Sequence, residues 1–226
     1  HMSIFDKFLR IRELGIFSII VIVVITASII DSRFLTIDSW RAVFLAIPLI
    51  LVMAMGQMMV IICRHVDISI GSILAFASIT IGFVFIHYPE TSLLIALLIT
   101  ASVGTVMGLV NGIIVTRFNV HSIIVTLGTL SLYRGLVFIV SGGRQIDRND
   151  IPVHIISFSQ TSFLFSIPAI LILSVIIVLI THLIMRHSVL GREIYATGSN
   201  PEAAHLKGIN VTKVTLFCFG VCGMLA

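Results

Sequence analysis

Charged side chains are scarce in this chain: Asp, Glu, Lys and Arg make up 11% of its 226 residues, whereas soluble globular proteins carry roughly 25%. Hydrophobic residues make up 58%. A chain this apolar cannot cover a surface that faces water, so lipid must be part of its solvent. The net charge of +4 fits Lys and Arg retained at one membrane face, and we expect no nucleic-acid partner.

Cysteine and nucleotide-binding motifs are also scarce. Cys63, Cys218 and Cys222 lie in or beside apolar runs, with neither a paired framework nor metal-ligand spacing, so we expect them to be small core residues. The sequence has no phosphate-binding loop of the Gly-x4-Gly-Lys-Ser/Thr kind, so ATP is not expected to bind here. We expect no catalytic residue, no metal ligand and no cofactor in this chain.

Long apolar runs, in contrast, dominate the chain. A membrane-spanning helix needs about 20 apolar residues, and we expect six spans, at residues 15–30, 42–63, 71–87, 93–115, 122–140 and 162–185. A seventh run, 214–226, is too short to cross, so we expect the N-terminal part of a longer protein. The predicted fold is all-α: a polytopic transmembrane helix bundle forming one domain, 1–226, with a cytoplasmic loop at 186–213.

The distribution of Lys and Arg predicts the orientation. With a cytoplasmic N-terminus, the inner segments hold nine of these residues and the outer segments hold four. The inner set is Lys7, Arg10, Arg12, Arg64, Arg117, Arg186, Arg192, Lys207 and Lys213; the outer set is Arg33, Arg41, Arg144 and Arg148. We therefore predict a multi-pass protein of the bacterial inner membrane with its N-terminus in the cytoplasm.

Small and polar residues mark two features within the spans. Gly104, Gly108 and Gly112 are four residues apart and form a flat stripe, where another helix can approach closely; Asn111 beside them can bond across helices. Asp67 and Ser69 stand just before the third span. They either cap the start of that helix or mark irregular backbone beside the solute pathway, and the sequence leaves both interpretations open.

Two further polar residues belong to the fifth span. Arg134 is the one Lys or Arg inside a predicted span, where a charge is costly. It faces the pathway or extends outward to the membrane surface, and the second interpretation is the stronger. His121, just before the span, is either a pH-sensitive group or a polar helix start, and the second is again favoured.

The loop at 186–213 has the start and stop signals of a short helix of about two turns. Ser199 or Asn200 can cap it, and Pro201 fits its first position. Glu202 lies in the first turn, where the helix dipole favours an acid, and Gly208 fits the stop. A capped surface helix on the inner face suits docking into a groove of a cytoplasmic partner.

At this loop the chain resembles a known family. Glu202-Ala203-Ala204, followed three residues later by Gly208, is similar to the coupling-helix motif of ABC importer permeases. Other segments resemble the ribose-type sugar permeases within it, and most of all the permeases that import autoinducer-2, with rhamnose and ribose permeases as near relatives. These segments are Ala54-Met55-Gly56, Asp67 to Ser72, Asn111-Gly112, Val125 to Gly135, Ser141-Gly142-Gly143, Gly191-Arg192 and Tyr195 to Gly198.

The resemblance implies partners and roles that composition does not reach. It implies a second permease, identical or related, two ATP-binding subunits that carry ATP and Mg²⁺, and a periplasmic solute-binding protein. It implies coupling to the ATPase through Arg192, Glu202, Ala203, Ala204 and Gly208. We assign a pathway role to Asp67, Ser69, Asn111, Thr126 and Arg134 as a hypothesis. The expected function is import of a small sugar-like solute, with autoinducer-2 first.

Other classes of membrane protein remain as alternatives. An ion-coupled secondary transporter would need acidic residues within its spans, and Asp67 at an edge is the nearest candidate. An intramembrane enzyme would need a nucleophile and base, or metal ligands, at depth; the eight His residues are instead scattered, mostly at span ends. The capped helix at Pro201 argues against a purely structural scaffold, which stays the third alternative.

Overall fold

The computed structural model describes residues 12–160, 162–163 and 167–226. It divides into two compact units, one up to Ala46 and one from Ile47 onward. Within the described residues the fold is helical, apart from a pair of two-residue antiparallel strands, β1 (Ser162–Phe163) and β2 (Ile167–Pro168). The all-α prediction is therefore confirmed.

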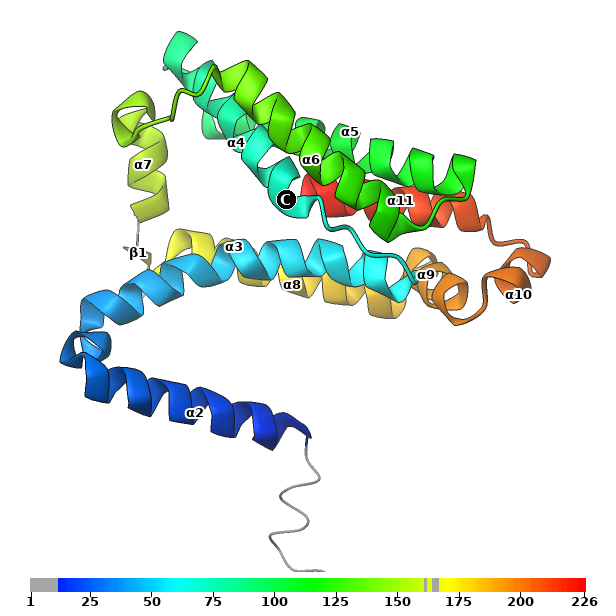
Figure 1. Ribbon diagram of the computed structural model, residues 1–226, viewed down its shortest axis with the longest axis horizontal. Coiled ribbons are helices and arrows are strands. Elements are labelled where there is room, and N and C mark those ends of the chain that lie inside the picture. Colours follow the sequence, from blue (N-terminus) through cyan, green and yellow to red (C-terminus); the bar gives the residue numbers. More distant parts are fainter. Residues whose placement is uncertain (1–11, 161, 164–166) are drawn as a thin grey trace, which may run out of the picture. The chain divides into compact units, whose positions relative to one another are not determined.

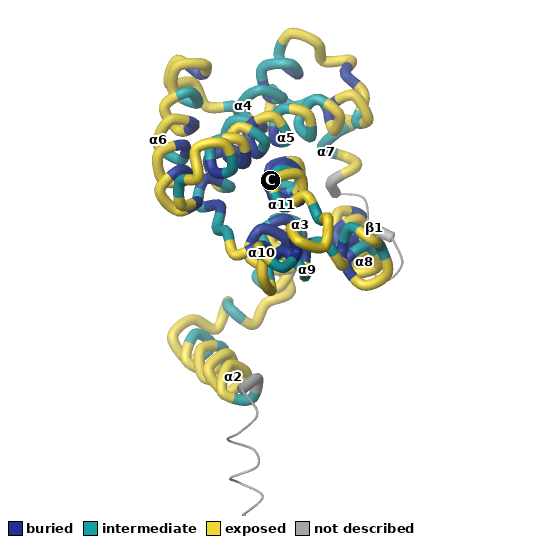
Figure 2. The backbone as a smooth tube through the Cα atoms, turned by 90° about the vertical axis from the view of Figure 1, so that its right-hand side faces the viewer, coloured by how far each residue is buried: buried dark blue, intermediate teal, exposed yellow. Residues whose placement is uncertain are grey.

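The first unit contains α2 (Arg12–Ile30), the 3-10 helix η1 (Ser32–Leu35) and the start of α3 (Ile37–Ile62). Most of the apolar side chains of α2 are exposed, as expected for a helix that faces lipid (Figure 2). Trp40 lies between Phe34 and Phe44, with ring centroids 6.2 and 6.4 Å away. Aromatic rings concentrate at membrane interfaces, so this cluster fits a connection between two spans.

The second unit contains the rest of α3 and the remaining elements. In chain order these are α4 (Ile70–His87), α5 (Leu93–Phe118), α6 (Ser122–Ser141), η2 (Arg148–Asp150), α7 (Val153–Gln160), the two strands, α8 (Ala169–His187), α9 (Val189–Ser199), α10 (Pro201–Leu206) and α11 (Val211–Met224). Figure 1 shows α4, α5, α6 and α11 packed side by side, with α9 and α10 at one end of that group.

Five described helices are long and apolar enough to cross a membrane: α3, α4, α5, α6 and α8. Two more apolar helices, Leu14–Ile30 and Val211–Met224, are shorter, so length and composition support five of the six full spans predicted. The predicted start of the last full span at 162 is wrong. Its helix begins at Ala169, because Pro168 has no backbone N–H to donate within a helix and instead precedes the first turn.

The residues between the predicted spans 122–140 and 162–185, for which no helix was expected, contain η2 and α7. The prediction missed α7, which is only eight residues long, because a periodicity signal needs a longer window. His154 on α7 has its Nε2 atom 3.0 Å from the Thr91 carbonyl, between α4 and α5. The α4–α5 connection and the segment between α6 and α8, which the predicted topology places at the outer face, therefore lie together.

The connections assigned to the inner face also meet. The Val66 N–H donates to Ser122 Oγ at 3.0 Å, and Arg64 Nη2 donates to the Ser199 carbonyl at 2.6 Å. These bonds join the α3–α4 connection to the start of α6 and the end of α9. The alternation of ends required by antiparallel spans is thus present among the helices from α3 to α9, while the cytoplasmic assignment of this end remains a prediction.

Close packing of α11 against α5 builds the centre of the second unit. A Cβ atom at Gly104 would overlap the Gly223 carbonyl, and one at Gly108 would overlap the Phe219 carbonyl. At Gly112 it would lie 3.1 Å from the Cβ of Phe219. The glycine stripe therefore brings two helix backbones into contact, which is how helices associate in lipid, where the hydrophobic effect between them is weak.

The buried core continues from α11 to the end of α3 and to α9. Cys218, Phe219 and Cys222 of α11 are buried with Val60 and Cys63 of the α3 end, and Ile194 of α9 joins them. The Sγ atoms of Cys63 and Cys218 are 3.5 Å apart. All three cysteines are free and buried, as the composition predicted.

Candidate functional site

A buried polar cluster lies where the α3–α4 connection meets α5 and α6. Asp67 Oδ1 accepts hydrogen bonds from the backbone N–H of Ser69 at 2.9 Å and from its hydroxyl at 2.6 Å. Asn111 of α5 donates to Asp67 Oδ2 at 3.2 Å and to Ser69 Oγ at 2.8 Å. Both carboxylate oxygens of Asp67 thus accept hydrogen bonds, and the donors come from the α3–α4 connection and from α5.

Tyr133 of α6 completes the cluster. Its hydroxyl is 2.9 Å from the Met107 carbonyl and 3.3 Å from Asn111 Oδ1, two acceptors on α5. Asp67 is 1% exposed and Asn111 0% exposed, so the cluster is enclosed by protein. Burying polar groups is costly unless they are hydrogen-bonded to one another, and here they are.

Burial also changes the titration of the carboxyl group. It raises the pKa of Asp67 by more than the hydrogen bonds from Ser69 and Asn111 lower it. The carboxyl group lies in the connection between α3 and α4, outside both helical spans. Desolvation disfavours the charged form, whereas the donors stabilise it, so the titration of this group reports on whether the cluster is closed.

The backbone around Asp67 is held from two further sides. Gln57 of α3 has its amide oxygen 3.2 Å from the Asp67 nitrogen and its amide nitrogen 3.3 Å from the Asp67 carbonyl, in the orientation that pairs donors with acceptors. Thr126 of α6 donates to the Ser122 carbonyl at 2.8 Å and lies 3.3 Å from the Val66 carbonyl. The connection is therefore an ordered piece of irregular backbone that three helices support.

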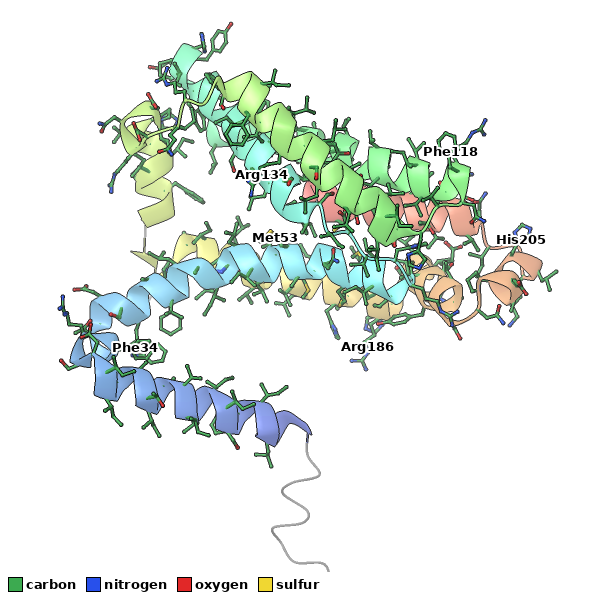
Figure 3. The ribbon with its side chains drawn as sticks, in the orientation of Figure 1. Phe34, Met53, Phe118, Arg134, Arg186 and His205 are labelled. Carbon is green, nitrogen blue, oxygen red and sulfur yellow. The ribbon has the colours of Figure 1, made fainter. Side chains whose placement is uncertain are left out.

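The structure distinguishes the sequence interpretations of these residues in part. Ser69 is the N-cap residue of α4 but makes no side-chain capping hydrogen bond, and Asp67 bonds to Ser69 itself instead of the first turn. Four of the five pathway candidates, Asp67, Ser69, Asn111 and Thr126, lie together. Arg134 does not join them: it is exposed on α6 (Figure 3), and no hydrogen bond or ion pair to it is found among the described residues.

Sequence reasoning did not assign Tyr133 and Gln57 to the site. Both stand in apolar runs, and Tyr133 was quoted only within a family motif. A tyrosine on a helix that faces lipid at depth would have no partner for its hydroxyl, so its presence in the fifth span was an available signal. No comparable signal marks Gln57, whose partner is backbone.

The second candidate region is the segment α9–α10. Helix α10 has the predicted signals in place: Asn200 accepts a hydrogen bond from the Ala203 N–H at 3.0 Å, and Pro201 is in the first turn. Gly208 follows with a φ of 85°, a conformation that favours glycine, and its N–H donates to the His205 carbonyl at 2.9 Å. The helix has six residues, slightly shorter than predicted.

One face of this segment is buried against the bundle and the other is exposed. Ala204 of α10 is buried, whereas Glu202 is exposed and Leu206 is 87% exposed. In Figure 3, His205 is seen on α10 at the outermost end of this part of the unit. Helix α10 therefore presents an exposed apolar side chain on a capped turn.

Helix α9 was not predicted, and it carries the anchor of the segment. Its inward face is Gly191, Ile194 and Thr197, while Arg192 is exposed. A Cβ at Gly198 would overlap the Ile62 carbonyl, so α9 crosses directly over the end of α3. Helix α9 is therefore closely packed between α10 and the end of α3. Among the described residues, no group of three or more His, Cys, Asp or Glu side chains is placed to hold a metal ion.

Comparison with known proteins shows what this architecture belongs to. Residues 40–226 match the family described as "Branched-chain amino acid transport system / permease component". The chain is 32% identical over 198 residues to the "Autoinducer 2 import system permease protein LsrC" of Yersinia pseudotuberculosis serotype O:3 (strain YPIII), which covers 88% of this chain and 55% of the relative. The LsrC protein of Yersinia pestis (strain Pestoides F) is similar to the same extent.

The chain spans about half the length of these relatives. No solved structure gives a significant match. The family match covers more than four fifths of the chain and includes both the buried cluster and the α9–α10 segment. The resemblance drawn from the motifs is confirmed at the level of the family: the chain belongs to the branched-chain amino acid transport system permease family.

Proposed function

We propose that this chain is the transmembrane permease subunit of a binding-protein-dependent ABC importer, and that α10 is the helix that docks into its ATP-binding subunit. The observation that carries the proposal is the capped, projecting α10 with Leu206 exposed, anchored through α9. The family match and the names of the relatives support it, because both describe transport permeases rather than enzymes.

In this proposal the chain itself performs no covalent chemistry. ATP binding closes the partner subunits, and α10 moves with the groove that holds it. Because Gly198 and Gly191 leave no space between α9 and its neighbours, α9 passes the movement on as a rigid body. The bundle then changes between outward-open and inward-open states. A second permease, a periplasmic binding protein and two ATPase chains complete the assembly.

The docking step is tested with full-length protein that is co-expressed with its ATPase and purified in detergent. Leu206→Asp places a charge at the exposed tip without touching the core, so we expect at least a tenfold loss of co-eluting ATPase, since burying an unpaired charge in the partner's groove is costly. The matched control is Tyr88→Asp, at an exposed apolar residue (68%) of the opposite end. Retention of the ATPase by the Leu206 variant would remove the basis of the proposal.

The solute proposed first is autoinducer-2, because relatives named for its import match 88% of the chain. Rhamnose and ribose are the sugar alternatives. Each candidate binding protein, loaded with its solute, is added to the reconstituted complex, and ATP hydrolysis is measured. Stimulation by the autoinducer-2 binding protein alone is the expected result. A complex that is stimulated by a branched-chain amino acid instead, as the family description would suggest, refutes the sugar-like assignment.

The pathway assignment remains part of the proposal. Asp67, Ser69, Asn111 and Thr126 are enclosed in the present structure, so a pathway beside them needs another conformation of the bundle. The variants Thr126→Cys and Arg134→Cys distinguish the alternatives. A water-soluble maleimide is expected to label the Thr126→Cys variant only during ATP turnover. Labelling of the Arg134→Cys variant at all times, with no labelling of the Thr126→Cys variant, would assign the buried cluster a purely structural role.

A further inference from the structure

A pocket of about 460 Å³ lies at the end of the bundle where the predicted inner connections meet. Its lining comes from the α3–α4 connection, the end of α5, the start of α6, the α9–α10 junction and the start of α11. The polar side chains that matter here are Arg64, His65, Thr116, His121, Thr197 and Thr212. This pocket is separate from the Asp67 cluster and from the exposed tip of α10.

The charge around this pocket has one sign. Arg64, His65 and His121 line it, and no Asp or Glu is among the described residues that do. Burial, together with the neighbouring His121, lowers the pKa of His65, so this ring is a neutral hydrogen-bonding group near pH 7 and Arg64 supplies the fixed positive charge. The lining thus offers positive charge and hydroxyl donors but no competing carboxylate.

Two helix N-termini add to the positive electrostatic potential of this pocket. Helix α6, of 20 residues, begins at Ser122, and α11, of 14 residues, begins at Val211; both residues line the pocket. The dipole and the uncapped N–H groups of a helix give its N-terminus a partial positive charge, which favours an oxyanion; at α11 the Lys213 N–H is already capped by the Asn210 side chain. His121 is the N-cap residue of α6 and makes no side-chain capping bond, so its ring is available.

Two side chains have unused hydrogen-bonding capacity. Thr197 is 1% exposed, and its hydroxyl is the buried polar atom without a hydrogen-bond partner in the described part of the chain. Arg64 sits at a φ of 65°, an unusual conformation for an arginine, and uses one Nη atom on the Ser199 carbonyl. Unpaired buried hydroxyls are rare, and a ligand in the pocket would explain this one.

A second basic hollow provides a comparison. It has a volume of about 390 Å³ and is lined by His182, Met185, Arg186, Arg192 and Tyr195. It has positive charge, but neither a helix N-terminus nor an unpaired buried hydroxyl lines it among the described residues. Both hollows at this end of the bundle therefore have positive charge. The pocket around Arg64 and Thr197 combines that charge with two helix N-termini and an unpaired buried hydroxyl.

We propose that the pocket around Arg64, His121 and Thr197 binds a phosphate group. Phosphate matches this site because it accepts several hydrogen bonds and carries the charge that Arg and helix N-termini favour. The group has two candidate sources, a free phosphate in the cytoplasm or the headgroup of an anionic phospholipid. Because Thr197 and Pro201 line the same pocket, an occupant would link the base of α10 to the starts of α6 and α11. The proposal does not depend on which solute is imported.

Inorganic phosphate tests the first source, and lipid nanodiscs test the second. The thermal unfolding midpoint of the full-length protein is measured in detergent as phosphate replaces chloride at constant ionic strength. It is measured again in nanodiscs of phosphatidylcholine alone and with phosphatidylglycerol. A ligand that binds only the folded state raises the midpoint. We expect the parent to respond in one arm, and the arm that responds identifies the source.

Three variants make the result specific. Arg64→Gln combined with His121→Gln should weaken the response about tenfold or more, because the charge-assisted bond from Arg64 and a ring donor are both lost. Arg186→Gln, in the second hollow, should respond like the parent. Thr197→Val keeps the shape of the side chain and should weaken the response without lowering the midpoint in chloride, which covers the case in which the double variant does not fold.

The proposal is overturned if the parent responds in neither arm. It is also overturned if the double variant and Thr197→Val respond fully, or if Arg186→Gln loses the response, since that result would indicate adsorption of anions to the basic surface. Co-elution of the ATPase is measured on the same samples. If the ATPase fails to co-elute but the phosphate response is intact, the proposed function is contradicted and the phosphate site stands. If the ATPase co-elutes but the phosphate response is absent, the phosphate site is contradicted and the proposed function stands.

Discussion

Replacement of Gly108 by alanine tests the contact on which the second unit depends. The added Cβ would overlap the Phe219 carbonyl and lie 3.1 Å from the Gly223 Cα, and all of these atoms belong to backbone or to a helix interior. No side-chain rotation relieves the overlap, so α11 must move away from α5. The same substitution at Gly135 of α6 meets no described atom within 4 Å and serves as the matched control.

The two variants share their intrinsic effect on the helix. Exchange of glycine for alanine inside a helix stabilises it by about 1 kcal/mol. At Gly135 this gain is unopposed, so we expect a neutral to stabilised protein. At Gly108 overpacking costs roughly 1–3 kcal/mol, with the upper end expected because only backbone can move. The shared gain cancels in the comparison, so the two variants should differ in unfolding free energy by the overpacking cost alone, about 1–3 kcal/mol.

The free energy of unfolding of the full-length protein, obtained by steric trapping in detergent, measures this difference directly. A second reading comes from distance labels on α5 and α11, which should move apart in the Gly108 variant and stay in place in the control. Equal stabilities for the two variants would mean that α11 does not pack on the glycine stripe, and the arrangement of the core described above would then be wrong.

Four other predictions follow from individual contacts. Asn111→Leu removes both donors to the Asp67–Ser69 pair and should lower the unfolding free energy by about 1–3 kcal/mol; a double-mutant cycle with Asp67→Asn should show coupling, and strict additivity would contradict the cluster. Because the folded pKa of Asp67 is raised, its contribution to stability is fully present below the unfolded pKa and is lost as the pH rises through the folded value; stability titrations should show this fall in the parent and not in Asp67→Asn. Asn200→Ala removes the cap of α10, worth about 1 kcal/mol, and should weaken ATPase co-elution less than Leu206→Asp does. Cys63, buried beside Cys218, should resist a soluble maleimide until the protein is unfolded, and rapid labelling of the folded protein would contradict that burial.

Local signals in the sequence were sufficient to predict α10. Its cap, its proline, its first-turn acid and its terminal glycine all act within a few residues along the chain, so their effect does not depend on the rest of the fold. Helix α9 next to it was missed, since its glycines at 191 and 198 weaken the helical signal. What stabilises α9 is contact with the ends of α3 and α8, to which these glycines allow close approach. Packing over long sequence separations outweighs propensity there.

For the glycine stripe and the polar residues, too, the sequence indicated single features, whereas their partners became visible only in the tertiary structure. The glycine stripe on α5 was visible because its spacing of four residues places it on one face, but the sequence did not identify α11, with Gly223, as its partner. Asp67, Ser69 and Asn111 were each noticed separately, and neither their cluster nor the inclusion of Tyr133 and Gln57 follows from spacing. Such residues meet only when three helices and a connection assemble.

The sequence by itself determined that the chain is helical, spans a membrane several times and belongs to a permease family, because hydropathy, span length and motifs are properties of contiguous residues. Only the tertiary structure decided that Asp67 is enclosed, that Arg134 stands apart from it, and that the connections predicted to be inner surround a pocket lined by Arg64. These features depend on which residues from distant spans come together, and that is determined by the fit of backbones at Gly104, Gly108 and Gly198.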